Sequence, residues 1–504
     1  MVQILNTQDG TINLVSSEEY IVPQGQLITS SGNAFSFAAQ TNILLVIEGT
    51  VFAGGGDGTS DSNTTDDVEV LIGRTGSVWA WSDGLEFSGT EITLRNLGSI
   101  VGAGDSGVEM LGVDSVLSNS GTIEGVGHGV QTNDVTSIIN SGLITGERGV
   151  DMRGGGTQLI NSGTIQSPGR VEDLFVESAG VYFYGGAGFV IRNTGLISGP
   201  EFSIKTTDVS SNDATIVNDG TLDGEVNLDA GVHVLTNSGT IMGDVLLGGG
   251  ADTYRGVASG VTAGQVLGEE GADTLIGGSE GDDLRGGTDA DLLVGHGGDD
   301  SLGGDAGIDM IFGGDGDDSI DGGTENDVLN ANAGDDSVYG GSGNDILVGQ
   351  DGSDFLEGGD GNDTMDGGNG DDILEGGDGD DILRGRAGED DLAGGLGRDY
   401  LTGGEGADNF VFRALAGTVA GANRDQILDF EQGVDLIVVA GMSPGVFEFR
   451  GTAAFAPSGN PELRLNETAT GSTIVQFDAD GNGTIDAEIR VGGVTGLTAD
   501  DFVL

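Results

Sequence analysis

The sequence contains no cysteine, which excludes disulfides and thiolate metal sites. It has one lysine, Lys205, and only 17 basic residues against 83 acidic ones, a formal net charge of −66. A surface of that charge repels nucleic acid and anionic lipid and attracts cations, so nucleic acid is excluded as a partner. Proline is also scarce, at 6 residues, although glycine reaches 100 of 504, and this combination excludes collagen and proline-rich linkers.

Long hydrophobic runs are missing as well. No stretch of 18 consecutive apolar residues occurs, so we expect no transmembrane segment. The first residues, MVQILNTQDGTINLV, have neither a basic region nor an apolar core, and we expect no ordinary secretory signal peptide.

A phrase of the type Asn-Ser-Gly-Thr-Ile recurs through the N-terminal half. It is an asparagine-glycine turn followed by a short apolar strand, and its steps of 19 to 32 residues are typical of one coil of a parallel β-solenoid. We therefore expect an N-terminal cap over 1–45 and a solenoid of about nine to ten coils over 46–267, with the asparagines stacked as a ladder. Independent hairpins of a sandwich, the alternative, do not explain so regular a phrase. The clear copies begin at Asn96, Asn119, Asn140, Asn161, Asn193, Asn218 and Asn237.

From Gly268 the period becomes nine, and it holds for sixteen repeats to Val411. In the register G-G-x-G-x-D-x-U-x the sixth residue is always aspartate, and the eighth is always apolar, from Leu275 to Phe410. We expect two repeats to make one turn of a coil, with x-U-x as a three-residue strand and G-G-x-G-x-D as a loop. Aspartates of alternate repeats then form two columns, with a carboxylate about every 4.8 Å.

These columns are unfavourable without a cation. Residues 268–411 hold 39 acidic and 4 basic residues, a net charge of −35, and neighbouring carboxylates repel by about 1 kcal/mol even in water. A divalent cation between coils turns this repulsion between carboxylates into attraction to the shared ion. A flexible all-oxygen cage suits Ca²⁺ better than Mg²⁺. With only His296 in this region, zinc and copper find no suitable ligand set. A disordered acidic tail, the alternative, has no reason to keep an aliphatic residue at every eighth position.

The repeats resemble the RTX (repeats-in-toxin) nonapeptides, a Ca²⁺-binding parallel β-roll. The resemblance implies that the sixth-position aspartates ligate Ca²⁺ with loop carbonyls, for a total of up to about fourteen ions. Glu280, Asp289 and Glu325 at the fourth position, and the repeat ANAGDDSVY at 331–339, depart from the pattern. The implied side-chain ligands are Asp273, Asp282, Asp291, Asp300, Asp309, Asp318, Asp327, Asp336, Asp345, Asp354, Asp363, Asp372, Asp381, Asp390, Asp399 and Asp408.

The same resemblance implies an extracellular location, reached through type I secretion machinery that reads an uncleaved C-terminal signal. We expect a small β-rich domain with that signal over 412–504, ending in DDFVL. The run DNFVF…DQILDF…GVDLI resembles the domain that follows the roll in serralysin-type proteases. Scarce Ca²⁺ would keep the roll unfolded inside the cell, and abundant Ca²⁺ would fold it outside, because binding energy is folding energy.

One further segment, DADGNGTIDAEI at 478–489, resembles the start of an EF-hand loop. The bidentate glutamate belongs at its twelfth position, which is Ile489, and Glu488 lies one residue early. The β-branched flanks favour a hairpin over two helices, and a weak additional Ca²⁺ site stays open.

An enzymatic role has few candidates. The three histidines, His128, His233 and His296, are isolated in the sequence, and the H-E-x-x-H motif of zinc proteases is absent. β-Solenoid enzymes that act on polysaccharides need a base beside a groove, and the best candidate is GERGVDMRG, with Arg148, Asp151 and Arg153; surface charges at a coil corner are the simpler interpretation.

A second candidate site lies in the longest interval between two asparagine phrases, which contains an insertion at 171–189. Its Phe175, Tyr182 and Tyr184 could stack on sugar or dock a partner, or could form the buried face of an inserted strand.

The sequence thus predicts an all-β protein, a parallel β-solenoid followed by an RTX β-roll and a small β domain. The preferred function is a secreted, non-enzymatic Ca²⁺-binding protein in a surface layer, matrix or adhesive contact. The alternative is a lyase or epimerase acting on an acidic polysaccharide. Cell-surface glycan is one expected partner, and self-association through exposed edge strands is another.

Overall fold

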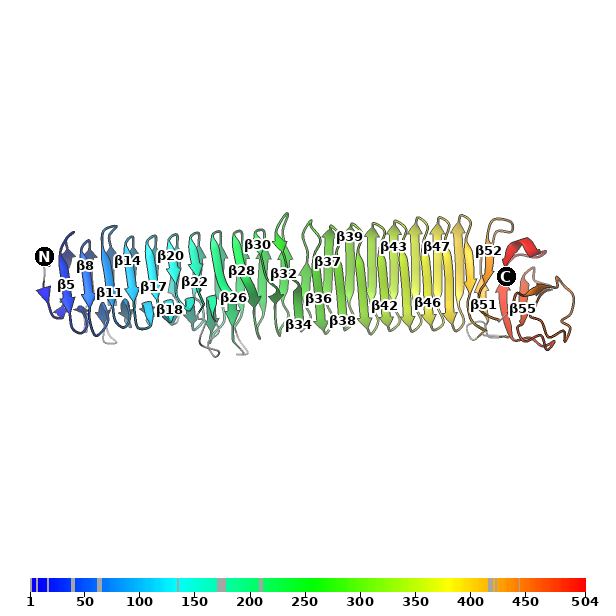
Figure 1. Ribbon diagram of the computed structural model, residues 1–504, viewed down its shortest axis with the longest axis horizontal. Coiled ribbons are helices and arrows are strands. Elements are labelled where there is room, and N and C mark those ends of the chain that lie inside the picture. The colour runs from blue at the N-terminus through cyan, green and yellow to red at the C-terminus, as the bar shows by residue number, and fades with distance from the viewer. Residues whose placement is uncertain are drawn as a thin grey trace. The chain divides into compact units, whose positions relative to one another are not determined.

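The computed structural model describes residues 2–5, 8–15, 18–37, 41–60, 66–133, 136–169, 178–207, 212–415, 420–421, 424–443 and 445–504. It consists of two compact units, Met1–Glu270 and Gly271–Leu504. Within each unit, parallel strands wind into stacked coils (Figure 1), which confirms the expected all-β parallel solenoid. Among the described residues, no helix has the length and apolarity needed to cross a membrane.

The first unit is a solenoid with three sides. The first side contains β7 (Thr41–Ile47), β10 (Asp66–Ile72), β13 (Thr93–Asn96), β16 (Ser115–Asn119), β19 (Thr136–Asn140), β22 (Gln158–Asn161), β25 (Phe189–Asn193), β27 (Ala214–Asn218), β29 (His233–Asn237) and β32 (Thr253–Gly256). The second contains β8 (Thr50–Ala53), β11 (Ser77–Ala80), β14 (Ser99–Gly102), β17 (Thr122–Gly125), β20 (Leu143–Thr145), β23 (Thr164–Gln166), β26 (Leu196–Thr206), β28 (Thr221–Asn227) and β30 (Thr240–Ile241).

The third side carries the polar cluster described below. It contains β12 (Leu85–Phe87), β15 (Ser106–Met110), β18 (His128–Asn133), β21 (Arg148–Arg153), β24 (Ala179–Tyr184), the second halves of β26 and β28, and β31 (Val245–Leu246).

Each coil of this unit contributes inward apolar residues from each side. In the coil of β13, β14 and β15 they include Leu94, Ile100, Val108 and Met110, all fully buried. The strands pair in register from coil to coil, so the same apolar positions stack along the axis. The core is a continuous column of aliphatic side chains, as a solenoid requires.

The asparagine ladder is confirmed. Asn161, fully buried at the end of β22, donates from Nδ2 to Oδ1 of Asn193 at 2.8 Å and to the Leu196 carbonyl at 3.1 Å. The equivalent bond links Asn140 to Asn161 at 2.8 Å. Each asparagine therefore satisfies polar groups of the next coil at a corner where the backbone turns.

The second unit begins with a two-sided roll whose coil is 18 residues long, which confirms two nonapeptides per turn. One side contains β35 (Thr274–Ile276), β37 (Leu292–Gly297), β39 (Met310–Asp315), β41 (Val328–Ala333), β43 (Ile346–Asp351), β45 (Thr364–Asn369), β47 (Ile382–Ala387) and β49 (Tyr400–Glu405). The other contains β36 (Asp283–Thr288), β38 (Ser301–Ala306), β40 (Ser319–Thr324), β42 (Ser337–Ser342), β44 (Phe355–Asp360), β46 (Ile373–Asp378), β48 (Asp391–Leu396) and β50 (Asn409–Phe412).

The prediction of three-residue strands was wrong. Most strands of the roll have six residues, because the pairing continues through the two glycines that follow x-U-x. The second glycine of such a pair takes a left-handed backbone, as at Gly359 (φ 103°). A Cβ on Gly359 would lie 2.0 Å from the carbonyl oxygen of Gly341 in the preceding coil. The loop between strands is therefore only three residues long.

After the roll, β51 (Asp425–Ile427) and β52 (Leu436–Val439) extend its two sides. An antiparallel sheet follows, formed by β54 (Glu462–Glu467), β55 (Thr473–Asp478) and β56 (Ala487–Val491), and then the 3₁₀ turn η2 (Ala499–Asp501) and β57 (Phe502–Val503). The strands β55 and β56 form a hairpin around 479–486, so the hairpin interpretation of DADGNGTIDAEI is confirmed and the two-helix interpretation is wrong.

Candidate metal centre and a polar cluster

The roll gathers its sixteen sixth-position aspartates into two columns, one at the start of the strands on each side. Their exposed fractions lie between 0% and 8%. In Asp291 and each later member to Asp408, Oδ1 accepts the backbone N–H of the aspartate one coil earlier, at 2.7–3.1 Å. One oxygen of each carboxylate thus holds the coils in register.

The other oxygen of these fourteen carboxylates, Oδ2, is buried and has no hydrogen-bond partner among the described residues. Burial, with neighbouring carboxylates adding to it, raises the pKa of Asp372 to about 7 and that of Asp354 to about 6. A buried carboxylate oxygen without a partner costs free energy, so the columns are poised for a cation.

The space around each Oδ2 depends on the glycine at the first position of the repeat. A Cβ on Gly349 would lie 2.1 Å from Oδ2 of Asp354 and 2.6 Å from the carbonyl oxygen of Gly367. The backbone at this position therefore packs against carboxylate and carbonyl oxygens too closely to carry a side chain, and a methyl group there would displace them. This all-oxygen donor set fits Ca²⁺ and does not fit zinc or copper.

The repeats that depart from the pattern keep their place in the columns, with one difference. Asp291 and Asp327, which follow Asp289 and Glu325, have the same arrangement as the regular repeats. In Asp282, by contrast, Oδ2 accepts the N–H of Gly278 at 2.6 Å.

Two column members were missed by the sequence analysis. The N–H of Asp399 donates to Oδ1 of Asp425 at 3.0 Å, and that of Asp408 donates to Asp435 at 3.1 Å. Burial raises the pKa of Asp425 to about 8. Asp425 and Asp435 follow the preceding column members by 26 and 27 residues instead of 18. Each is still followed by the x-U pair of the repeat, so the pattern D-x-U without a fixed spacing would have found them.

The loop at 479–486 brings together carboxylate oxygens of Asp478, Asp480 and Asp486 within 4.8 Å of one another. Both oxygens of Asp478 already accept backbone N–H groups, from Asn482 and Gly483. Glu488 turns away to Arg424, with an N–O distance of 3.0 Å.

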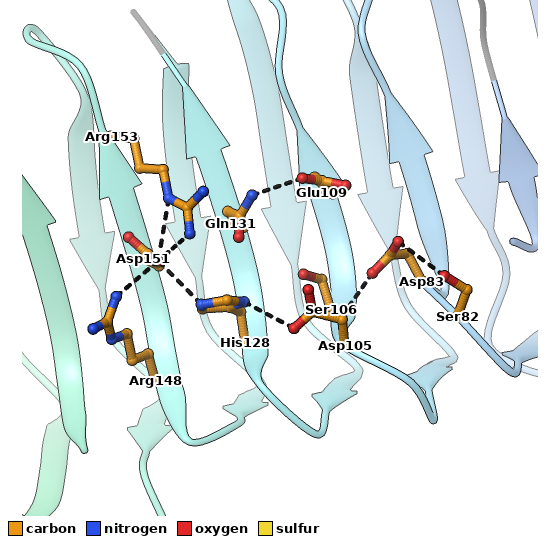
Figure 2. A network of polar contacts seen from close by, with 10 residues as sticks. All are labelled: Ser82, Asp83, Asp105, Ser106, Glu109, His128, Gln131, Arg148, Asp151 and Arg153. Carbon is orange, nitrogen blue, oxygen red and sulfur yellow. Dashed lines mark hydrogen bonds and ion pairs between the residues drawn. The ribbon is translucent and has the colours of Figure 1, made fainter. Parts of the chain in front are cut away.

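A second polar site lies on the first unit. Asp151, fully buried in β21, joins Arg148 (3.3 Å), Arg153 (3.0 Å) and His128 (3.1 Å) through its Oδ2 (Figure 2). His128 also contacts Asp105 at 3.3 Å. The sequence predicted the grouping of Arg148, Asp151 and Arg153, but it missed His128 and Asp105, which come from neighbouring coils.

The charges in this cluster reinforce one another. Burial opposes the charged form of His128, but hydrogen bonds to Asp105 and Asp151 outweigh it and raise its pKa to about 9. Burial likewise opposes ionised Asp151, and His128 and Arg153 outweigh it and lower the pKa of that carboxyl. At neutral pH the cluster therefore consists of an imidazolium, two guanidinium groups and carboxylates.

The predicted aromatic insertion is described only in part. Tyr182 and Tyr184 lie on β24 beside the polar cluster, with their ring centroids 5.8 Å apart, whereas Phe175 lies outside the described residues. The exposed fraction of Tyr182 is 4%, which agrees with the buried-face interpretation for this residue.

The roll and its oxygen donors define the class of this protein, a calcium-binding parallel β-roll. A family model described as the RTX calcium-binding nonapeptide repeat (4 copies) matches residues 267–302, 276–311, 312–347, 339–374, 348–383 and 375–410. Through this segment the chain belongs to the RTX calcium-binding repeat proteins.

No curated protein matches the chain. Among solved structures, the chain is similar to the solution structure of the AlgE6R3 subunit from the Azotobacter vinelandii mannuronan C5-epimerase, at 32% identity over 29% of this chain and 80% of that one, with a TM-score of 0.24.

Proposed function

We propose that this chain is a secreted, non-enzymatic Ca²⁺-binding protein whose β-roll folds on Ca²⁺ outside the cell. The observation that carries the proposal is the row of fourteen buried carboxylate oxygens that lack a hydrogen-bond partner among the described residues. Their repulsion and desolvation oppose folding, and a divalent cation removes both penalties at once. Asp273 to Asp408, in steps of nine, are the proposed side-chain ligands.

Ca²⁺ when bound supplies the positive charge that the roll lacks. The first-position glycines give the ion room, and the loop carbonyls complete the oxygen shell. In this proposal 268–411 is the Ca²⁺-binding module, 46–267 is the solenoid that meets a surface or matrix, and 412–504 carries the signal for type I secretion.

The polar cluster supports a binding role over a catalytic one. His128 contacts a carboxylate through each ring nitrogen and is protonated at neutral pH. A polysaccharide lyase or epimerase needs a base that can accept a proton at working pH, and an imidazolium so held does not serve. Arg148 and Arg153, the candidates from the sequence, are both paired with Asp151, and this pairing outweighs burial and raises the pKa of Arg153.

The test is a Ca²⁺ titration of the full chain after chelation, with far-UV circular dichroism and bound metal followed together. We expect a cooperative gain of β-structure with many ions bound and no comparable response to Mg²⁺. A chain that is fully folded in chelator and indifferent to Ca²⁺ would refute the proposal.

A further inference from the structure

One side of the roll carries an apolar outer surface within a strongly acidic segment. On β35, β37, β39, β41 and β43 the eighth residue of each repeat points into the core, so its neighbours at the seventh and ninth positions point outward. The strands pair in register, and these outward residues therefore form two columns along the roll, a surface that we call the apolar roll face. The first column is Thr274, Leu292, Met310, Val328 and Ile346, and the second is Ile276, Val294, Phe312, Asn330 and Val348.

The apolar roll face is open to solvent. The exposed fraction is 47% for Met310 and 45% for Ile346, and Ile308, in the loop before β39, is 58% exposed. Packing of the coils does not require apolar residues at these outward positions, because the other side of the roll has polar or small residues there. On β36, β38 and β40 they are Asp283, Arg285, Ser301, Gly303, Ser319 and Asp321. A contiguous exposed apolar surface indicates an interaction site.

Exposed carboxylates frame the apolar roll face on both edges. No lysine or arginine occurs between Arg285 and Arg384, and the one histidine in that interval is His296. The face is therefore an apolar stripe with anionic borders. The border carboxylates are Asp299, Asp315, Asp317, Asp335 and Asp351 where the strands end, and Asp289 and Glu325 in the loops where they begin.

Part of this border is fixed in place. Oδ1 of Asp299, Asp317 and Asp335 each accepts the N–H of the matching loop residue one coil later, at 2.9–3.1 Å. These three carboxylates thus form a row with one member per coil. Ordered charges lose little conformational freedom when a cationic partner binds.

Bound Ca²⁺ would leave the borders anionic. The proposed Ca²⁺ ligands are the buried sixth-position aspartates, whereas the border carboxylates are exposed. Fourteen Ca²⁺ ions, the largest number expected, would change the net charge of 268–411 only from −35 to −7. A partner would therefore meet apolar contacts along the middle of the face and attraction for cations at its edges.

The dimensions of the face match a helix that lies along the roll axis. Its five coils, about 4.8 Å apart, span about 19 Å, the length of about 13 helical residues. Its two columns, about 7 Å apart, have the width of the apolar stripe on an amphipathic helix. Successive coils and successive helical turns have similar spacings, about 4.8 Å and about 5.4 Å, so basic residues beside that stripe would meet about one border carboxylate per turn.

We propose that the apolar roll face binds a basic amphipathic helix of a partner protein. The apolar stripe of the helix packs on Met310, Phe312 and Ile346, and its basic residues lie against the border carboxylates. A second copy of this chain would bring two anionic borders together, and an anionic lipid surface would meet the same repulsion. The inference goes beyond the function proposed above and rests on it only for the folding of the roll.

The test is calorimetric titration of the full chain, in saturating Ca²⁺ and at about 0.15 M ionic strength, with a 14-residue peptide of leucine and lysine whose leucines form one helical stripe. Three control peptides leave the protein unchanged: one with the same composition in scrambled order, one with serine for leucine, and one with glutamate for lysine. Circular dichroism and bound metal on the same samples report whether the roll is folded. A roll that Ca²⁺ does not fold would overturn both proposals, whereas a folded roll that does not bind the striped peptide would overturn this inference alone.

We expect the striped peptide to bind roughly tenfold or more tightly than each control peptide, because only it combines the stripe with the charge. Ile346→Lys should weaken this binding roughly tenfold, since a cation replaces an apolar contact on the face. The matched control is Ile373→Lys, which adds the same charge at the same repeat position on the other side, where Ile373 is 41% exposed, and it should bind as the parent does. Met310→Lys is a second variant on the face, for use if Ile346→Lys folds poorly.

Four other results would each overturn the inference. The first is equal binding of any control peptide, which would mean that charge alone or apolar contact alone acts. The second is equal loss of binding in Ile346→Lys and Ile373→Lys, which would place the peptide elsewhere. The third is a parent chain that sediments as a dimer in Ca²⁺ while Ile346→Lys is a monomer, which would assign the face to self-association. The fourth is binding to phosphatidylcholine vesicles that Ile346→Lys abolishes, which would assign the face to a membrane.

Discussion

Buried carboxyl groups of this protein have opposite properties, depending on the residues around them. Asp151 and Asp372 both have exposed fractions of 1% or less. The pKa of Asp151 is lowered because cationic side chains outweigh its burial, whereas burial raises the pKa of Asp372 to about 7. The first carboxylate is neutralised by its own chain, and the second requires a proton or a metal ion.

The histidines give a prediction at this scale. His128 should titrate with a pKa of about 9, because Asp105 and Asp151 stabilise its charge, and His233 with a pKa of about 4, because burial disfavours its charge. NMR of ¹³Cε1-labelled histidine in the full chain would follow both. The pKa of His128 is higher in the folded protein than in the unfolded chain. Its contribution to the free energy of unfolding is therefore complete below about pH 6.5 and is lost as the pH rises through about 9.

The control for this titration is His128→Gln, which should remove the resonance with a pKa of about 9 and leave that of His233. If no histidine titrates above pH 8, the cluster is not assembled in solution as described.

At the scale of the repeat, the first residue decides whether a column site is open. At thirteen glycines from Gly286 to Gly403, a Cβ would lie 2.0–2.7 Å from the aspartate Oδ2, so any side chain there would displace the carboxylate. The repeat 331–339 begins instead with Ala331, which is fully buried. The repeat of Asp336 therefore has the least room for an ion.

Exchange of these first residues should act in opposite directions. We expect Gly349→Ala to remove about one Ca²⁺ ion from the folded roll and to raise the Ca²⁺ concentration at the folding midpoint, because the new methyl would displace the carboxylate of Asp354. Ala331→Gly should lower that midpoint. Bound metal and circular dichroism, measured together, report both effects.

A matched control is Gly445→Ala, whose Cβ would meet only Pro461 at 3.5 Å, an ordinary contact. This variant should bind Ca²⁺ as the parent does. Equal metal content in all three variants would show that the first-position gap does not hold the ion.

The regular elements could be predicted from the sequence because the period itself encodes them. The asparagine phrase marks a corner of each coil, and the nonapeptide fixes which carboxylates align. Asp425 and Asp435 were not predicted as column members, because loops between the strands interrupt the nine-residue period. His128 was not predicted as a member of the polar cluster for another reason. Its contact with Asp151 joins two coils, and no spacing within one coil reveals it.

At the scale of the whole molecule, the two units differ in what stabilises them. The first unit satisfies its buried asparagines within the chain and stacks three aliphatic columns. The roll has one inward apolar residue in nine and a net charge of −35 over 268–411. We therefore infer that the first unit folds without Ca²⁺ and that the roll does not.

Limited proteolysis of the full chain would separate these behaviours. In chelator we expect a protected fragment that ends near residue 270, because the unfolded roll is cleaved while the coils of the first unit resist. In Ca²⁺ protection should extend through the roll. Sodium chloride at matched ionic strength is the control, since screening alone weakens repulsion between exposed charges but does not fill a buried oxygen site. If salt protects the roll as well as Ca²⁺ does, repulsion between exposed charges alone keeps the roll unfolded. Ca²⁺ would then not act by binding the buried carboxylate oxygens.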